Sequence, residues 1–320
     1  MNDPVNEPVN EPVNDPGEYT PAPPADFVLP FDLPKADLRG RLVRLDAVST
    51  RALSAHPLPE DAQRVLAEAL VLAGLLGSAL KLEGRLSVQT KGDGPLTMAV
   101  ADYFAGGGLR GYGRLDEERF NALEKKNDFS ALVGNGALAI TIEPTPGAPA
   151  YQGLVSLSPK SLSASAETYF MQSEQLPTII TLAAGFIYQS GVGYGWRAAG
   201  LMVQAVPGKT EDSVRHGDNW QRISMFLETL TALELLDTSL SAESLLWRLF
   251  HEDEIRVHPA KELHFQCTCS ADKVLPVLQS YPVEERPSLA DEDGVIRTRC
   301  EFCGTEYKFP LSEIDSQPAD

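Results

Sequence analysis

Cysteine is absent from the first 266 residues of this 320-residue chain, so its four occurrences near the carboxyl end are informative. They form two close pairs, Cys267-Thr268-Cys269 and Cys300-Glu301-Phe302-Cys303. Four thiolates in two pairs are typical of one tetrahedral metal ion, and this donor set favours zinc in a closed structural site. Gly304, directly after the second pair, suits the tight turn of a metal knuckle. We therefore predict one Zn²⁺ per chain, with Cys267, Cys269, Cys300 and Cys303 as its ligands.

Two structural disulfides are the alternative for the same four residues. No secretory signal precedes them, so we expect a reducing compartment, in which structural disulfides are rare. No apolar run reaches the length of a membrane span either. The sequence therefore predicts a cytoplasmic protein without a membrane partner.

Positive charge is scarce, because 27 Lys and Arg face 45 Asp and Glu and the net charge is −18. Residues 251–320, which contain the cysteines, carry 15 acids and 7 bases. A protein that binds phosphates needs clustered Lys and Arg. Small zinc modules often bind DNA or RNA. Because this module is acidic, we predict that the protein has no nucleic-acid partner.

Recognisable catalytic motifs are missing too. Gly208-Lys209-Thr210 lacks the glycine that a phosphate-binding loop needs five positions earlier, because Val203 stands there. Gly191–Trp196 is not a dinucleotide fingerprint, and no nucleophile elbow occurs. Glu174 has no evident partner acid or nucleophile, so a structural hydrogen-bonding role is simpler. His264 lies nearest the cysteines, but four thiols already complete a ligand set. We predict that the protein is not an enzyme.

The first 30 residues contain no Lys or Arg, but they hold eight prolines and six acids. Proline at this density interrupts helices and sheet ladders, and the few apolar residues cannot offset the entropy of ordering. We predict a disordered tail that solubilises the protein or acts as a spacer.

Beyond this tail, runs of strands with helices at irregular intervals predict an α+β fold. We expect strands at 38–46, 86–90, 96–101, 109–112, 137–142, 151–157, 178–187 and 197–206, and helices at 59–80, 161–175 and 213–233. The predicted order is a tail (1–30), a large N-terminal domain of mixed strands and helices (31–233), a helical linker (234–262), a small C-terminal zinc-binding module (263–310) and a second tail (311–320).

Within the linker, Leu235–Phe250 is dense in apolar residues arranged as short helical pieces. One interpretation is an ordinary core helix. The other is a cover that docks on the large domain and can detach from it.

The cysteine pairs and the segment Gly294–Phe309 resemble the zinc switch of the heat-shock protein 33 family, which consists of redox-regulated holdase chaperones. Segments of the large domain also resemble that family, at Leu109–Tyr112, Tyr151–Val155, Tyr169–Thr178, Gly200–Pro207 and Leu249–Glu252. The resemblance runs from about Leu38 to Phe309. Residues 1–30 have no counterpart in it, and Lys273–Asp293 matches weakly.

This resemblance implies an ATP-independent chaperone that is inactive when reduced and zinc-bound. It implies activation by oxidants, such as peroxide with heat or hypochlorous acid, with disulfides Cys267–Cys269 and Cys300–Cys303. It also implies a homodimer in the oxidised state and unfolding client proteins as partners.

Elementary energetics agree with such a switch. Zinc holds thiols as thiolates, which oxidants attack to form a sulfenic acid and then a disulfide with a neighbouring thiol. Structural zinc contributes roughly 10–16 kcal/mol to folding of small modules, whereas a whole domain has a net stability of about 5–15 kcal/mol. We expect a thin core in the zinc module, formed by Phe265, Val274, Leu275, Leu278, Phe302, Tyr307 and Phe309. Loss of zinc should therefore unfold it and expose apolar surface.

Two other functions compete with this one. A thiol oxidoreductase would use Cys300 and Cys303, but the βαβ context of thioredoxin-like proteins is missing. A zinc-ribbon adaptor would bind its partner in reducing buffer, and peroxide would not change that binding.

Overall fold

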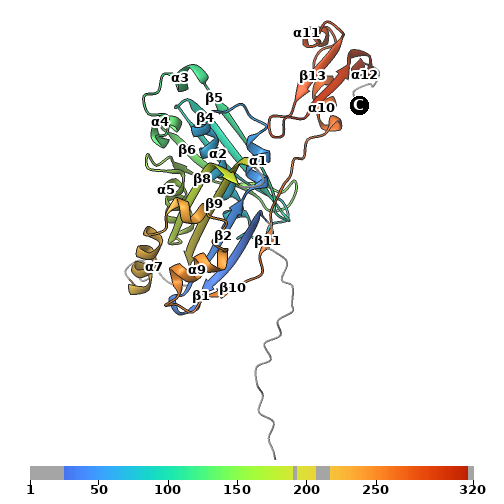
Figure 1. Cartoon of the computed structure of the whole chain (residues 1–320). Coiled ribbons are helices and arrows are strands. Elements are labelled where there is room, and N and C mark those ends of the chain that lie inside the picture. Colours follow the sequence, from blue (N-terminus) through green and yellow to red (C-terminus); the bar gives the residue numbers. More distant parts are fainter. Residues whose placement is uncertain (1–24, 190–192, 207–216, 316–320) are drawn as a thin grey trace, which may run out of the picture.

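The computed structural model describes residues 25–189, 193–206 and 217–315, and in this part of the chain two six-stranded sheets enclose one long helix (Figure 1). Helix α2 (Glu60–Gly77) is buried on nearly all sides, because it contacts strands of both sheets. Apart from Glu68, whose burial raises its pKa to about 7, the sequence is apolar around the whole circumference from Val65 to Leu76, as expected for a helix without a solvent face. Helices and strands are mixed, so the α+β prediction is confirmed. No described helix has the length and apolar character needed to cross a bilayer.

The first sheet has the strand order β10-β1-β2-β9-β8, and β11 also pairs with β1. Its strands are all antiparallel: β1 (Phe27–Leu33), β2 (Leu38–Leu45), β8 (Thr178–Gln189), β9 (Gly193–Ala205), β10 (Arg256–Val257) and β11 (Lys261–Glu262).

The second sheet has the order β12-β5-β4-β3-β6-β7. Its strands are β3 (Arg85–Gly92), β4 (Leu96–Phe104), β5 (Gly108–Leu115), β6 (Gly136–Glu143), β7 (Tyr151–Ser156) and β12 (His264–Phe265). Only the β12–β5 pair is parallel among these strands. The expected pairing of 137–142 with 151–157 is therefore confirmed, as the pair β6–β7.

Short helices surround the two sheets. They are α1 (Ala47–Leu53), α3 (Glu117–Asn121), α4 (Phe129–Val133), α5 (Leu162–Tyr169), α7 (Asp218–Glu228), α8 (Ala232–Leu236) and α9 (Ala242–Phe250), with a 3₁₀ turn at Pro34–Ala36. The helix predicted at 161–175 changes after Tyr169 into a π-helical turn, Phe170–Glu174, which ends before Pro177. Of the helix predicted at 213–233, residues 213–216 lie outside the described part.

Helices α7, α8 and α9 cover the face of the first sheet that points away from α2. Their apolar side chains form a second core with β1, β2 and β9, in which Phe250 stacks on Phe31 at 5.8 Å between ring centroids. The fit is close, because a Cβ added at Gly40 would lie 2.1 Å from the Phe31 ring. The segment Leu235–Phe250 is thus a helical cover over a large apolar surface.

A small module follows at one end of the large domain (Figure 1). It contains α10 (Ala271–Gln279), α11 (Arg286–Leu289), the hairpin β13 (Val295–Arg299) and β14 (Glu306–Pro310), and α12 (Leu311–Asp315). Its buried core is small, with Leu278, Ile296, Phe309 and Ile314 at the centre. The core is thin, as expected, but its membership differs. Phe265 packs against the core of the large domain and Phe302 against Tyr112.

Three of the predicted boundaries are wrong. The N-terminal tail ends before residue 30, because β1 begins at Phe27 and its apolar side chains are buried between β2 and the helical cover. The linker is helical only to Phe250, and its later part forms β10 and β11 on the edge of β1. The second tail begins later than residue 311, because α12 places Ile314 in the module core. Residues 1–24 lie outside the described part.

Helix α9 offers a matched pair of substitutions that tests the cover. Phe250 is fully buried, so Phe250→Ala should lower the free energy of unfolding by about 3–5 kcal/mol. Trp247 on the same helix is 61% exposed, so Trp247→Ala should change it by less than about 0.5 kcal/mol. Urea unfolding followed by circular dichroism measures both. Equal effects would contradict the assigned packing.

Candidate metal centre

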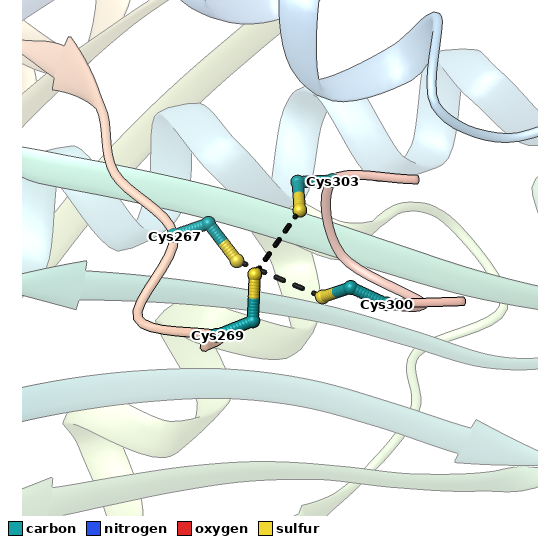
Figure 2. Close-up of side chains that lie close together, drawn as sticks. All are labelled: Cys267, Cys269, Cys300 and Cys303. Atoms are coloured by element: carbon teal, nitrogen blue, oxygen red, sulfur yellow. Dashed lines mark hydrogen bonds between the residues drawn. The ribbon is translucent and has the colours of Figure 1, made fainter. Parts of the chain in front are cut away.

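The four cysteines lie on two short turns that the fold holds against each other (Figure 2). Cys267 and Cys269 directly follow β12, and the amide of Gln266 donates to the carbonyl of Leu109 at 2.8 Å. Cys300 follows β13, and Cys303 lies in the turn before β14. This turn closes through the amide of Gly304, which donates to the carbonyl of Cys300 at 2.8 Å. Gly304 has φ 72°, a left-handed conformation that favours glycine, as the sequence predicted.

The sulfur atoms gather in one place, and all four lie within 4.8 Å of one another. Sγ of Cys267 is 3.7 Å from Sγ of Cys300, and Sγ of Cys269 is 3.4 Å from Sγ of Cys303. A disulfide needs about 2.05 Å, so all four cysteines are free. A tetrahedron of sulfurs with Zn–S bonds of about 2.3 Å has edges of about 3.8 Å. The donor set and its spacing therefore fit a tetrahedral thiolate site.

The surroundings affect the four thiols differently. Burial raises the pKa of Cys267, Cys269 and Cys300. Burial acts on Cys303 in the same direction, but hydrogen bonds with Thr305 and with neighbouring thiols lower its pKa to about 6. Oγ1 of Thr305 lies 3.1 Å from Sγ of Cys303. The Tyr307 hydroxyl donates to Sγ of Cys269 at 3.1 Å, and this bond raises the pKa of Tyr307 to about 12. The cluster is thus hydrogen-bonded on two sides, with the Tyr307 hydroxyl donating to Cys269 and the Cys303 thiol donating to Oγ1 of Thr305.

Arg110 connects both cysteine turns to the large domain. It lies on β5 opposite Asp102 of β4, and its Nε and Nη2 each lie 2.8 Å from Oδ2 of that buried carboxylate. Its Nη1 donates to Oγ1 of Thr268, between the first two cysteines, at 3.1 Å. Its guanidinium carbon lies 3.9 Å from the ring centroid of Phe302, between the second two cysteines. One buried side chain therefore touches the residue inside each cysteine pair.

Two further arginines join the same surfaces. Nη2 of Arg51, on α1, lies 3.5 Å from the carbonyl oxygen of Cys303, and its guanidinium stacks over Phe265. Nη2 of Arg299, at the end of β13, donates to the carbonyl of Ala55 at 3.1 Å. Polar and ring contacts thus hold the cysteine end of the module against α1 and β5.

The other residues considered from sequence lie elsewhere. His264 belongs to β12 with its side chain exposed and is not part of the sulfur cluster. Glu174 accepts a hydrogen bond from Tyr169 at 2.9 Å, which agrees with a structural role. The sequence predicts Tyr307 only as a core residue and gives no sign of its bond to Cys269 or of the Arg110–Asp102 pair beside the cysteines. Arg110 belongs to the segment Leu109–Tyr112 that resembles the family, but nothing local indicates that it faces the cysteines.

Exchanging Arg110 for lysine should loosen the module without unfolding the large domain. Lysine keeps the charge near Asp102 but loses the planar, forked donor that reaches Thr268 and stacks on Phe302. We expect hydrogen exchange at the Gln266 amide to accelerate by about tenfold or more. This corresponds to a decrease of about 1.5 kcal/mol in the free energy of local opening at β12.

Arg85→Lys is the matched control, because Arg85 also reaches Asp102, at 3.7 Å, and has no described contact with the module. Equal acceleration in both variants would show that the Asp102 charge pair, and not the contact with the cysteine turns, controls the docking.

Comparison with known proteins gives one consistent result. The family profile described as Hsp33 protein matches residues 26–310. The 33 kDa chaperonin of Caulobacter vibrioides (strain NA1000 / CB15N) is 39% identical over 286 residues, covering 88% of this chain and 94% of the relative. That of Escherichia coli O17:K52:H18 (strain UMN026 / ExPEC) is 36% identical over 288 residues, covering 88% and 93%.

A solved structure shows the same fold. The crystal structure of the 33 kDa chaperonin (heat shock protein 33 homolog) from Thermotoga maritima superposes with a TM-score of 0.72 at 22% identity, covering 91% of this chain and 97% of that one. The family consists of chaperones, so the interpretation as an oxidoreductase enzyme is wrong. A family profile over most of the chain, together with relatives above 30% identity, shows that this chain belongs to the Hsp33 family of chaperones.

Proposed function

We propose that the protein is a redox-regulated, ATP-independent holdase in the cytoplasm that binds unfolding proteins. In the reduced chain, Cys267, Cys269, Cys300 and Cys303 hold one Zn²⁺. The observation that supports this most is the convergence of four free sulfurs, within 4.8 Å, from two turns far apart in sequence. When bound, zinc supplies a crosslink between these turns and keeps their sulfurs as thiolates.

The oxidation step involves only the thiols and an oxidant. Two thiols give up two electrons and two protons to hydrogen peroxide through a sulfenic acid, which yields one disulfide and two molecules of water. We propose the disulfides Cys267–Cys269 and Cys300–Cys303. The two sulfur contacts described above run between the pairs instead. The proposed pairing therefore requires the turns to separate, which removes the link between them.

Separation of the turns affects the docking surface directly. Thr268 and Phe302, which Arg110 contacts, lie inside the two cysteine pairs. The module core is too small to keep its structure without a metal, since it buries few apolar side chains. Once the module detaches, the chain that leads back to α8 and α9 loses its anchor.

The surface exposed by this change suits a holdase. The side chains of α7–α9 and of the first sheet bury a large apolar cluster, and its release would present that cluster to unfolding clients. The chain's net charge of −18 would keep such complexes in solution. We also propose that the oxidised form is a homodimer, which would enlarge the surface available to one client.

One experiment on a single sample tests the function. The reduced protein should contain one zinc per chain, and peroxide combined with heat should release it. Circular dichroism should then show partial loss of structure, and aggregation of a heated client should fall. A zinc-ribbon adaptor would instead bind its partner equally well before and after peroxide.

Disulfide mapping by mass spectrometry tests the pairing, and serine variants provide the control. Cys267→Ser/Cys269→Ser should still form Cys300–Cys303, whereas Cys267→Ser/Cys300→Ser should form neither proposed bond. If the oxidised native chain yields Cys267–Cys300 and Cys269–Cys303 and stays folded, the unfolding mechanism is wrong, although a chaperone role could persist.

A further inference from the structure

A cavity that opens at the surface of the large domain has no part in the mechanism above. Its volume is about 220 Å³, and it lies between the two sheets at the carboxyl end of α2. Apolar side chains such as Leu76 and Ile140 form most of its wall. An apolar cavity of about 150 Å³ is enough to hold benzene, so this one has room for a ring with a short chain.

Two charged side chains, the cation Arg39 and the acid Glu174, belong to this mainly apolar wall. Arg39 on β2 lies directly opposite Gln204 on β9, which also lines the cavity and is 2% exposed. Nε of Arg39 is buried and has no hydrogen-bond partner among the residues that the structure describes. A buried donor without a partner costs about 1–3 kcal/mol, so a ligand that accepts from it gains affinity.

A second arginine makes this end of the cavity more positive. Arg41 lies two residues along β2, on the same side of the strand, and its buried Nε also has no described partner. Burial lowers the pKa of Arg41, and the charge of Arg39 adds to that effect, while Asp32 opposes it. Two neighbouring guanidinium groups therefore favour an anion at the Arg39 end of the cavity, away from the exposed carboxylate of Glu174, which accepts from Tyr169.

The π-helical turn Phe170–Glu174 contributes to the wall of the cavity. Its residue Phe170 lines the cavity together with Tyr169 and Glu174. The Tyr169 hydroxyl donates to Glu174, and Gln175 closes the turn in a left-handed conformation at φ 52°. Such a conformation is uncommon outside glycine, and π-helical turns often lie at functional sites. This is the same Tyr169–Thr178 segment that resembles the family in sequence and that the redox mechanism leaves without a role.

We propose that this cavity binds a small amphipathic carboxylate, with its carboxylate on Arg39 and its apolar body between α2 and β6. A carboxylate matches the guanidinium fork and carries one charge, whereas a phosphate dianion would need more donors than this wall offers. The proposal goes beyond the redox function and does not depend on it, since none of the cavity residues belongs to the cysteine module.

Titration of the reduced, full-length protein with 3-phenylpropionate tests the site by calorimetry and saturation-transfer NMR. We expect a Kd below about 1 mM. Arg39→Met should weaken binding by about 10- to 100-fold, and Arg39→Lys should weaken it less, because it keeps the charge. Ala79→Leu, which fills the cavity, should abolish binding while leaving Arg39 in place.

Two controls separate this site from adventitious binding. Arg64→Met removes a charge from the surface of α2 outside the cavity, and it should leave the Kd unchanged. The neutral analogue 3-phenylpropan-1-ol should bind the native chain more weakly than the acid. Thermal unfolding confirms that each variant folds. Absence of binding at 10 mM, about tenfold above the expected Kd, or equal affinity in Arg39→Met and the native chain, overturns the proposal.

Discussion

The C-terminal module depends on one constraint, which is that two turns must keep four sulfur atoms within 4.8 Å although they lie 33 residues apart in sequence. The module's own apolar core contains few buried side chains, so it contributes little to holding these turns together. The same turns provide the contacts with Arg110, Arg51 and Ala55 through which the module docks. The proposed metal site, the folding of the module and its attachment to the large domain therefore all depend on one small cluster.

Arg110 links the two cysteine turns to the large domain. Its charge is balanced by Asp102 within the large domain, so its remaining donors and its flat face are available to the module. Neither contact with the module is a buried ion pair of its own. The separation that the proposed function requires would therefore leave no unpaired charge in the interior, which would keep its free-energy cost low.

The sequence was sufficient where a signal is local. The cysteine pairs, the β6–β7 hairpin and the amphipathic or fully apolar runs all carry their own pattern, and the structure contains each of them. The strand β1 was missed because Pro30 and the adjacent acidic tail hide it, although Pro30 lies in a strand whose neighbours on the far side are the short β10 and β11. Strands of two polar residues, such as β11, have no periodicity to detect.

Contacts between residues far apart in the sequence could not be predicted, because they leave no local pattern. Nothing near Arg110 in sequence reveals that Thr268 and Phe302 face it, since these residues are more than 150 positions away. Phe265 and Phe302 were assigned to the module core because hydrophobicity alone does not tell which body buries a side chain. Likewise, the family-like segment around Tyr169 gave no indication that it closes a cavity.

The path of residues 251–265 has a mechanical consequence. This strap pairs with β1 at β10 and β11 and then crosses to β5 as β12, so it borders both sheets through pairings of only two residues each. Tension applied from the cysteine end loads these pairings one after another, beginning with β12, instead of shearing them together. The strap would therefore separate from the sheets in steps towards α9. The number of pairings broken would determine how much apolar surface is exposed.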